Sequence, residues 1–374
     1  MSSARRICTR CVLDTSVPDI QFDENGECQF CKQYDARIAN ELRYGPEGER
    51  RLKSIIEKIK VDGANKQYDC LLGVSGGADS TYVAYLAVRR FGLRPLAIHV
   101  DNGWNTDLAV ENIQHTMSTL GIDLVTTVLD WNEFRDLQRS FLFAGIANAE
   151  IPTDHSIVAT LFNEARSRKL RYIITGSNLV TEAVLPDSWM HDAYDLRLIK
   201  SVQRRFGTRK LRTFPTISYR RLFWMLAIEG YKFVNILNYE AYVKTEVKTT
   251  LANELGWRDY GGKHNESTFT KFFQGFILPR KFGIDKRRAH LANLVLAGQM
   301  TRVDALDELS RPYMNAAELD REKAYVAKKL GFTLAEFDAM MDGPVRSARS
   351  FPHGATMKER LGVLAQLAKR KATS

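Results

Sequence analysis

The residues with the clearest capacity for chemistry follow the apolar run Leu71 to Val74 and read Ser75-Gly76-Gly77-Ala78-Asp79-Ser80. Two glycines allow the backbone to approach a phosphate closely, and the serines add hydroxyl donors. A helix-forming stretch comes next, so the N–H groups at its start present a positive dipole end to an anion. The segment predicts a pyrophosphate-binding turn that suits ATP, and the alternative is an ordinary Gly-Gly turn between a strand and a helix. The predicted nucleotide-binding residues here are Val74, Ser75, Gly76, Gly77, Asp79 and Ser80.

Two common nucleotide-binding motifs, G-x-x-x-x-G-K-[ST] and G-x-G-x-x-G, do not occur in this sequence. Their absence weighs against kinases, GTPases and dehydrogenases. The pattern Ser-Gly-Gly-x-Asp-Ser instead resembles the PP-loop of the N-type ATP pyrophosphatases. Enzymes of that superfamily cleave ATP between the α and β phosphates and place AMP on an oxygen of the substrate, which is the chemistry that the resemblance implies.

Four of the five cysteines form two C-x-x-C pairs, Cys8 with Cys11 and Cys28 with Cys31, separated by sixteen residues. This is the spacing of a tetrahedral Cys₄ zinc knuckle, in which each pair places two thiolates on one metal ion. Such a site is structural, because no coordination position remains for a catalytic water. A redox or sulfur-carrying pair and an iron–sulfur cluster are the alternatives. The fifth cysteine, Cys70, lies in an apolar strand and is expected to be a buried core residue.

From Tyr68 onward the pattern of apolar residues alternates between strands and helices. Strands are predicted at 69–74, 95–100, 123–129 and 171–175, with helices at 79–91 and 107–120 and further helical stretches up to 169. This alternation indicates an α/β protein with a doubly wound parallel sheet. Beyond Pro186 the alternation fades, and helices are predicted at 219–229, 244–255, 285–297, 302–309, 316–330 and 334–341.

Ligands of such sheets gather at the carboxyl ends of the strands near the topological switch point. The strand that ends at Val100 is followed by Asp101-Asn102-Gly103-Trp104, and the strand from Arg171 is followed by Thr175-Gly176-Ser177-Asn178. Each loop alone reads as a turn, but their common position beside the PP-loop adds Asp101, Asn102, Thr175, Gly176 and Asn178 to the predicted nucleotide site.

The chain has 374 residues, 44% of them hydrophobic, and a formal net charge of +10. This length fits two domains with a small appendage, and the charge suits either RNA or a substrate with several phosphates. The N-terminus lacks an apolar signal region and no window is long enough to span a bilayer, so we expect a cytoplasmic protein without membrane insertion. The predicted division is 1–45 for the zinc knuckle, 46–215 for the PP-loop domain and 216–374 for a helical, basic, substrate-binding domain.

Between residues 260 and 290 many charges alternate with aromatic residues. Arginine and lysine are suited to phosphates or a sugar carboxylate, although a charge run is often only a solvated surface. The predicted substrate- or phosphate-binding residues in this stretch are Lys263, His264, Arg280, Lys281, Lys286 and Arg287.

Taken together, the Cys₄ knuckle, the PP-loop, Asp101-Asn102-Gly103-Trp104, Thr175-Gly176-Ser177-Asn178 and the stretch from Gly261-Gly262-Lys263-His264 to Arg288 resemble the N-acetyl sugar amidotransferases. These are the WbpG/PseA-type enzymes of lipopolysaccharide O-antigen and nonulosonic acid biosynthesis. The resemblance runs from about Cys8 past Thr301. It implies a PP-loop ATP pyrophosphatase fold, which is adenine nucleotide α-hydrolase-like. One departure is Ala78, where PP-loops often carry lysine; Lys271, Lys281 or an arginine of the basic stretch is expected to supply that cation.

The reaction implied by the resemblance turns an acetamido group of a nucleotide-linked sugar into an acetamidino group. ATP adenylates the amide oxygen, ammonia attacks the resulting imidate carbon, and AMP departs. Asp79 is expected to hold Mg²⁺, Glu266 to act as a base with His264 as its alternative, and Lys271 to act with them as a catalytic residue.

The ammonia implies partners, because free ammonia is scarce at neutral pH and no second cysteine–histidine–acid arrangement suggests a glutaminase in this chain. The resemblance points to a separate glutaminase subunit and a cyclase-like, ammonia-conducting subunit.

Two rival functions stay open. One is a PP-loop tRNA-modifying enzyme of the thiolase or lysidine-synthase type, although thiolation usually needs a reactive cysteine and only Cys70 is available. The other is a nucleic-acid-binding protein without catalysis, which an intact PP-loop disfavours.

Overall fold

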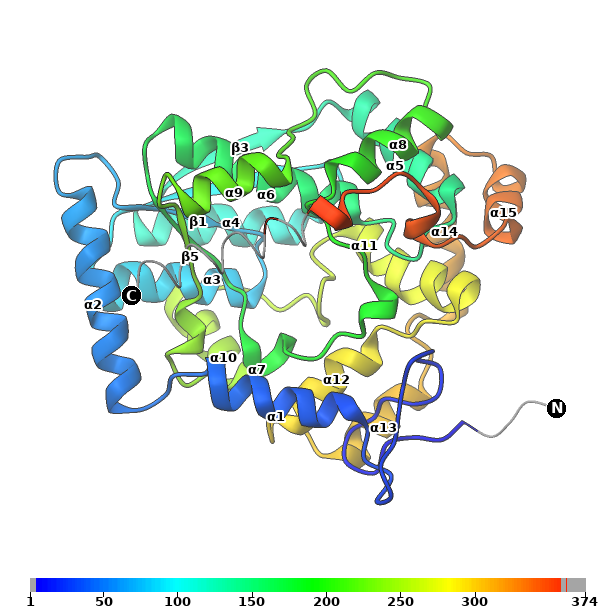
Figure 1. Cartoon of the computed structure of the whole chain (residues 1–374), viewed down its shortest axis with the longest axis horizontal. Coiled ribbons are helices and arrows are strands. Elements are labelled where there is room, and N and C mark those ends of the chain that lie inside the picture. The colour runs from blue at the N-terminus through cyan, green and yellow to red at the C-terminus, as the bar shows by residue number, and fades with distance from the viewer. Residues whose placement is uncertain (1–4, 358–360, 362–374) are drawn as a thin grey trace.

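The computed structural model describes residues 5–357 and 361. Its centre is a sheet of five parallel strands in the order β3-β2-β1-β4-β5 (Figure 1). The order reverses between β1 and β4, which makes the carboxyl ends of these two strands the topological switch point. The strands are β1 Cys70–Gly73, β2 Pro95–Asp101, β3 Asp123–Val128, β4 Tyr172–Ile174 and β5 Lys232–Val234.

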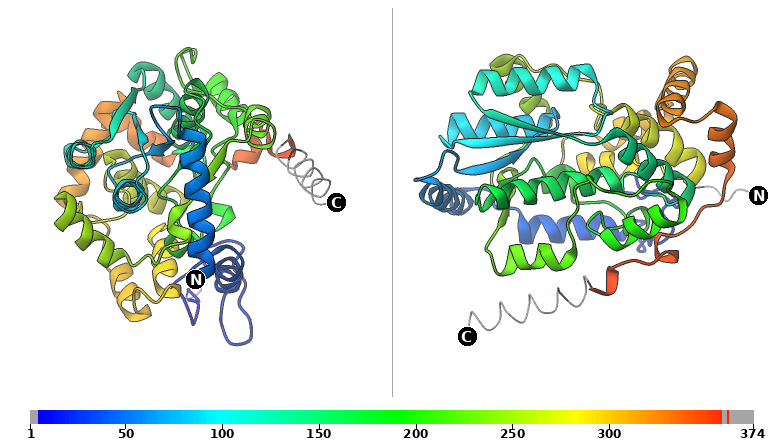
Figure 2. Two further views of the ribbon diagram at one scale, coloured as in Figure 1. Left: turned by 90° about the vertical axis from the view of Figure 1, so that its left-hand side faces the viewer. Right: turned by 90° about the horizontal axis from the view of Figure 1, so that it is seen from above.

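The two faces of this sheet pack against different helices because successive side chains of a strand point to opposite sides. Leu72 of β1 and Ala97 of β2 belong to one core, whereas Leu71 and Ile98 belong to another. The first core includes residues of α2 (Pro46–Gly63), α3 (Ala78–Tyr85), α4 (Asp107–Leu120) and α10 (Lys244–Leu255). The second includes residues of α6 (Ile151–Ser167) and α9 (Tyr219–Ala227). The view from above shows helices on both sides of the strands (Figure 2).

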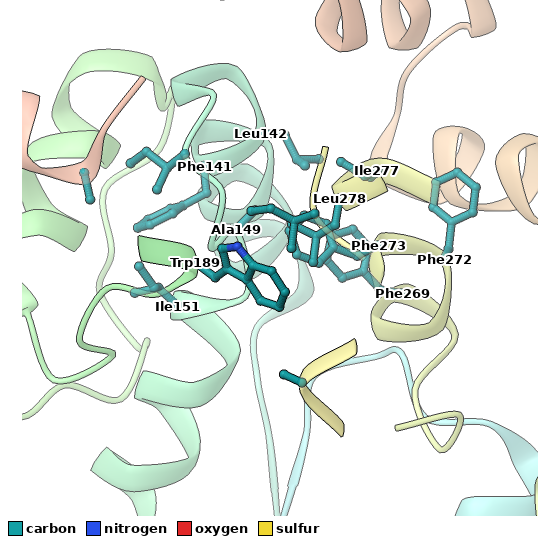
Figure 3. Packing of buried hydrophobic residues seen from close by; sticks show 14 of the residues in the cluster. Phe141, Leu142, Ala149, Ile151, Trp189, Phe269, Phe272, Phe273, Ile277 and Leu278 are labelled. Atoms are coloured by element: carbon teal, nitrogen blue, oxygen red, sulfur yellow. The ribbon is translucent and has the colours of Figure 1, made fainter. Parts of the chain in front are cut away.

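A third core, rich in phenylalanine, lies beyond the carboxyl ends of the strands. Phe269, Phe272 and Phe273 pack there with Trp189 and Phe141 (Figure 3). It joins the loops of the sheet to the helical C-terminal part of the chain. The helices around it are α5 Trp131–Ala144, α8 Leu196–Phe206, α11 Thr268–Phe272, the π-helical turns η4 Phe273–Phe282, α12 Arg287–Leu296, α13 Arg302–Ser310, α14 Ala316–Leu330 and α15 Leu334–Asp342.

The N-terminal segment with its four cysteines continues into α1 (Gln29–Glu41), which contacts α7 (Leu179–Glu182) and α12. Figure 1 shows α1 next to α12. The remaining short elements are η1 Leu86–Arg90, η2 Asp187–Trp189, η3 Ile236–Asn238 and η5 Ala348–Ser350.

The predicted fold class is confirmed: the sheet is parallel and doubly wound, a cysteine cluster precedes it and a helical region follows it. The helices predicted at 107–120, 244–255 and 316–330 have the predicted bounds. The helix predicted over 79–91 ends at Tyr85 and continues as the π-helical turn η1.

The sequence analysis did not predict strand β5, because three residues are too few to show a period. This strand pairs with β4, so the sheet includes residues beyond 215, where the PP-loop domain was predicted to end. The division at 45 and 215 stays a prediction, and residues 1–4, 358–360 and 362–374 of the outer two segments lie outside the described residues. No helix among the described residues combines the length and the apolar character needed to cross a bilayer.

Candidate functional site

The PP-loop lies at the switch point of the sheet and is fixed by its own hydroxyl groups. Ser80 Oγ accepts a hydrogen bond from the Ser75 N–H (3.2 Å) and donates one to the Gly77 carbonyl (3.2 Å). Gly76 has φ +81°, and a Cβ there would lie 2.7 Å from the Ala109 carbonyl oxygen. Only glycine fits this turn, which leads directly into the N-terminus of α3. The first N–H groups of that helix have no intrahelical acceptor and suit an anion.

A cavity of about 600 Å³ opens above this loop. One part of it is apolar and is lined by Ile98, Val100, Ile157, Leu161 and Phe233, which provide a slot for a flat ring. The PP-loop residues Ser75, Gly77, Asp79 and Ser80 lie next to this slot. An apolar region and an anion-binding turn in one cavity are the two environments that the base and the phosphates of ATP require.

The loop after β4 approaches the PP-loop so closely that only glycine fits at one of its positions. A Cβ at Gly176 would lie 2.7 Å from the backbone nitrogen of Ser80 and 2.9 Å from the carbonyl carbon of Asp79. Thr175 lines the cavity and donates a hydrogen bond from Oγ1 to Asn235 Oδ1 (2.9 Å). Gly176 therefore lets β4 close the nucleotide site against the start of α3.

Three lysines that the sequence analysis did not assign to the PP-loop face the cavity near it. Lys244 and Lys248 are four residues apart on α10, and Lys263 lies in the loop before α11, 3.0 Å from Glu182 Oε1. Burial lowers the pKa of Lys244, while the negative charge of Asp79 opposes that shift. The sequence analysis expected Lys271 or Lys281 to replace the lysine missing at Ala78. This expectation is corrected: neither residue lines the cavity, whereas these three lysines and Lys286 do.

Asp79 lies at the start of α3 and accepts a hydrogen bond from the Tyr242 hydroxyl. Burial raises the pKa of this carboxyl group, and Lys263 and Lys244 oppose the rise. Asp79 and Glu182 both line the cavity. Carboxylate oxygens beside a polyphosphate are the donors that Mg²⁺ prefers, so the residues present fit the predicted metal ion.

Glu266 lies directly above the PP-loop, where Oε1 would be 3.7 Å from a Cβ at Gly77. Its other oxygen, Oε2, is buried and has no hydrogen-bond partner in the described structure. Burial alone would raise the pKa of Glu266. His264 Nδ1 lies 3.7 Å from Glu266 Oε1. His264 and Lys263 together outweigh the effect of burial and lower the pKa of Glu266. Glu266 is therefore an ionised carboxylate facing the position where the phosphates of ATP would lie.

The segment that carries Glu266 is fastened to the sheet at both ends. Trp257 Nε1 donates to the Gly76 carbonyl (2.9 Å), and the Thr106 N–H donates to the Glu266 carbonyl (2.9 Å). Between these points the Tyr260 hydroxyl lies over Gly77, 3.1 Å from where a Cβ would be, and the Ala78 N–H bonds to it. Tyr260 thus occupies the anion-binding end of the PP-loop, and no motif in the sequence marked it for this position.

The far end of the cavity is polar and acidic. Asn102, Thr153 and Asp154 line it with Glu150 and Gln274. Asn102 Nδ2 lies 3.4 Å from Thr153 Oγ1, and Gln274 Nε2 donates to Glu150 Oε2 (3.2 Å). Burial, with the nearby Glu150, raises the pKa of Asp154 to about 6. This end offers carboxylates and amides that can hydrogen-bond a sugar.

Several predicted site residues have structural contacts outside this cavity. Asp101 Oδ1 accepts from the Gly103 N–H (2.8 Å), and Asn178 caps α7 by accepting from the Thr181 N–H (2.9 Å). Lys281 Nζ donates to three carbonyl groups at the end of α15, and Arg280 is exposed. None of these four side chains lines the cavity.

Lys271, predicted to be catalytic, is bound by two carboxylates of α14, Glu318 (2.5 Å) and Glu322 (3.6 Å). Its charge is therefore neutralised away from the PP-loop. Arg287 forms an ion pair with Asp285 (2.7 Å). Both residues line a second cavity, described below, rather than the PP-loop cavity.

The four N-terminal cysteines are buried and their Sγ atoms all lie within 4.8 Å of one another. The distances Cys8–Cys31, Cys11–Cys28 and Cys28–Cys31 are each 3.7 Å. Four sulfurs bound tetrahedrally at the usual Zn–S length of about 2.3 Å lie roughly 3.8 Å apart. The cluster is therefore compatible with the predicted zinc ion. Cys70 is fully buried in β1, as expected of a core residue.

Comparisons with known proteins agree with parts of this description. Residues 266–362 match the sequence model of a family described as LPS biosynthesis protein WbpG-like, C-terminal domain. The chain is 25% identical over 283 residues to an uncharacterized protein of Methanocaldococcus jannaschii, covering 72% of this chain and 83% of that protein. It is 28% identical over 174 residues to the glutamine-hydrolyzing GMP synthase of Pyrobaculum aerophilum, covering 46% of this chain but only 31% of the synthase.

Among solved structures, the chain is similar to NMN synthetase from Francisella tularensis, with a TM-score of 0.36 and 13% identity over 81% of this chain and 97% of that one. The NH3-dependent NAD synthetase from Campylobacter jejuni gives a TM-score of 0.32 and 15% identity, over 76% and 95% of the two chains. The C-terminal match confirms the resemblance of residues 266–362 to the WbpG-like family.

Proposed function

We propose that this protein is an ATP-dependent, AMP-forming amidotransferase that converts the acetamido group of a nucleotide-linked N-acetyl sugar into an acetamidino group. The observation that carries the proposal is the position of Glu266. This residue opens the segment that matches the WbpG-like C-terminal domain, and it lies over Gly77 of the PP-loop. One cavity thus combines an ATP-binding turn with a residue from the part of the chain that resembles sugar-modifying proteins.

In the first step, the amide oxygen of the sugar attacks the α-phosphorus of ATP. A P–O bond to the oxygen forms, the α–β bond breaks, pyrophosphate leaves and the amide N–H loses its proton. The PP-loop N–H groups and Lys244 stabilise the departing pyrophosphate; Lys248 and Lys263 also line the cavity, but each is paired with a carboxylate. Mg²⁺, when bound by Asp79 and Glu182, supplies further neutralisation of the phosphates.

In the second step, ammonia attacks the imidate carbon and forms a C–N bond. The C–O bond to AMP breaks, AMP leaves, and the nitrogen gives up a proton. Glu266 is placed to accept this proton because its Oε2 has no other partner and the carboxylate is ionised. Glutaminase and cyclase-like subunits are proposed as the source of ammonia, in keeping with the implied need for a partner.

The test is the release of AMP and pyrophosphate from ATP with ammonium at mildly alkaline pH, with and without UDP- or CMP-linked N-acetylated sugars. Replacing O by NH lowers the mass of the sugar by about one unit. Sugar-dependent AMP together with this mass shift would support the proposal. Ser75→Ala should reduce the rate, and Ser310→Ala, on the surface of α13, is the matched control.

The tRNA-modifying alternative predicts a different dependence, namely AMP release that responds to tRNA and ignores every sugar. Thiolation within that alternative needs an accessible thiolate, but Cys70 is buried and burial raises its pKa. The same assay with tRNA in place of the sugar separates the two functions, and tRNA-dependent AMP alone would overturn the proposal.

A further inference from the structure

A second cavity of about 710 Å³ adjoins the PP-loop cavity. The two cavities share a wall formed by Tyr260, Gly262, Lys263 and His264 of the segment before α11. Glu182, Gln274 and Lys286 also line both. The second cavity then extends between α7, α12 and the loop around Tyr313. It is therefore a neighbouring cavity that shares lining residues with the PP-loop cavity.

The size of each cavity matches a single ligand. Sites for molecules of drug or nucleotide size measure about 300–1,000 Å³. The first cavity, at about 600 Å³, has the size of a single nucleotide site. With ATP on the PP-loop and in the apolar slot, its polar end is left for a small group, and a second nucleotide does not fit beside ATP. An acceptor larger than its acetamido group therefore needs space outside the first cavity, and the second cavity provides that space next to the PP-loop.

The charges around the second cavity favour an anion. Its lining contains Lys263, Lys271, Lys286, Arg287 and Arg311. The acidic residues in the lining are Glu182, Glu308 and Glu318. Five cationic side chains thus face three carboxylates, but four of the five are ion-paired: Lys263 with Glu182, Lys271 with Glu318, Arg287 with Asp285 and Arg311 with Asp307. Lys286 forms no ion pair with any residue of the described structure, so its charge is available to a ligand.

Helix α12 begins at this cavity. Its first turn carries positive side chains, whereas the first turn of a helix usually favours acidic ones. Lys286 is the N-cap, Arg287 follows it, and the first turn contains no acidic residue. Cations at a helix N-terminus are unfavourable because the dipole already places positive charge there. Asp285 offsets part of this positive charge. Its carboxylate pairs with the Arg287 side chain and accepts a hydrogen bond from the Arg287 backbone N–H (3.1 Å). The remaining positive charge is what an anionic ligand would neutralise.

His290, one turn further along α12, provides an independent indication of a ligand. It lines the cavity, and its Nδ1 atom is buried without a hydrogen-bond partner in the described structure. Its Nε2 lies 3.5 Å from Nζ of Lys244, which faces the first cavity. Burial and the nearby lysines hold the pKa of His290 well below its ordinary value. A neutral imidazole with one unsatisfied nitrogen suits a polar group of a bound ligand.

We infer that the second cavity binds the phosphate-bearing nucleotide carrier of the acceptor, a nucleoside mono- or diphosphate, while ATP occupies the PP-loop cavity. The carrier phosphates contact Lys286, Arg287 and the start of α12, and Tyr313 offers an aromatic face to the base or sugar. The acetamido group then reaches across the shared wall toward Glu266. The role as acceptor site rests on the proposed function, whereas the existence of a second nucleotide site does not.

The experiment is a calorimetric titration of the full chain, first saturated with α,β-methylene-ATP and Mg²⁺, using UDP and, separately, CMP. We expect one further molecule of at least one of these nucleotides to bind. Lys286→Ala should weaken that binding by about tenfold, which corresponds to one charge-assisted contact of roughly 1.4 kcal/mol, and Arg311→Ala should weaken it less because Arg311 is already paired with Asp307. Arg280→Ala is the matched control, because Arg280 is exposed in the same basic stretch and lines neither cavity.

The outcomes separate this inference from the proposed function. If neither UDP nor CMP binds to the ATP-analogue complex, or if both bind only when the analogue is absent, the second site is refuted. Equal weakening by Arg280→Ala would also refute it, because a diffuse positive surface would then explain the binding. Saturable binding that the variants weaken, combined with no sugar-dependent AMP formation, would retain the second nucleotide site and reject the amidotransferase reaction.

Discussion

Lys244 provides the sharpest test of how this chain compensates for the missing PP-loop lysine at Ala78. Its side chain lies on α10, faces the PP-loop cavity and forms no ion pair with any residue that the structure describes. Replacing it by methionine keeps most of the length of the side chain and removes the charge. One charge-assisted hydrogen bond contributes about 1.5–3 kcal/mol, so Lys244→Met should weaken binding of α,β-methylene-ATP by about 10- to 150-fold.

The same substitution should leave the fold at least as stable. Burial lowers the pKa of Lys244. A lysine whose folded pKa lies below its unfolded pKa destabilises the folded state at every pH below the folded pKa. Removing that buried charge should therefore raise the urea midpoint or leave it unchanged. Weaker nucleotide binding in a protein of undiminished stability would exclude misfolding as the cause.

Lys248→Met is the comparison variant, because Lys248 also faces the cavity but is paired with Asp259 (2.5 Å) and is 31% exposed. Since Asp259 and solvent already compensate this charge, its contact with a phosphate should contribute no more than about 1 kcal/mol, and Lys248→Met should change the affinity by less than about fivefold. The measurement is calorimetric titration with the ATP analogue in the presence of Mg²⁺. A change of less than threefold for Lys244→Met, or an equal effect of both variants, would refute the assignment of Lys244 as the substitute cation.

Four further predictions concern catalysis and stability. Glu266→Gln should lower the rate of AMP formation by about 10²- to 10⁴-fold without weakening ATP-analogue binding, because it removes a negative charge that faces the phosphates, and equal rates would exclude Glu266 as the base. Gly176→Ala places a Cβ 2.7 Å from the Ser80 nitrogen, so stability measured by urea unfolding should fall by about 1–3 kcal/mol. Cys28→Ala should abolish stoichiometric zinc in metal analysis and lower the thermal midpoint; unchanged zinc content would contradict the Cys₄ site. Asp136→Asn should destabilise the protein near neutral pH but not at low pH. Although burial opposes ionisation of Asp136, hydrogen bonds outweigh it and lower its pKa; the stabilisation is thus present above the unfolded pKa of about 3.9 and lost as the pH falls through the folded value.

The parts of the site that could be predicted from the sequence are those that depend on the backbone conformation of a short segment. Gly76 needs a positive φ, and a Cβ at Gly176 would meet the start of α3, so the glycines mark these turns in the sequence itself. The cysteine pairs likewise have a spacing that one metal ion explains. In each of these cases a short segment contains enough of the geometry to be recognised.

The cations were harder to assign, because a charged side chain can act wherever the fold carries it. Lys271 and Lys281 occur in the basic stretch that suggested phosphate binding, but one is held by Glu318 and the other by the carbonyl groups at the end of α15. Lys244 occurs in a correctly predicted helix whose pattern gives no sign of a site. Only the packing of α10 against α3 brings it to the PP-loop. The partners of a lysine are therefore a tertiary property that periodicity does not contain.

The N-terminal segment with the four-cysteine cluster also bears on the site, because it contacts helices α12 and α13, which line the second cavity. Arg302 of α13 donates to the carbonyl groups of Cys8 (2.7 Å) and Cys11 (3.0 Å). Arg288 of α12 donates to the Val12 carbonyl (2.8 Å) and lies 3.1 Å from Asp14. A Cys₄ site folds its segment only when metal is bound. If the cluster holds the predicted zinc ion, loss of that ion removes the acceptors that fix the start of α12. The PP-loop is fixed by its own serines and by Trp257, so zinc removal should weaken UDP or CMP binding much more than ATP-analogue binding, and equal weakening would show that the two cavities are not held independently.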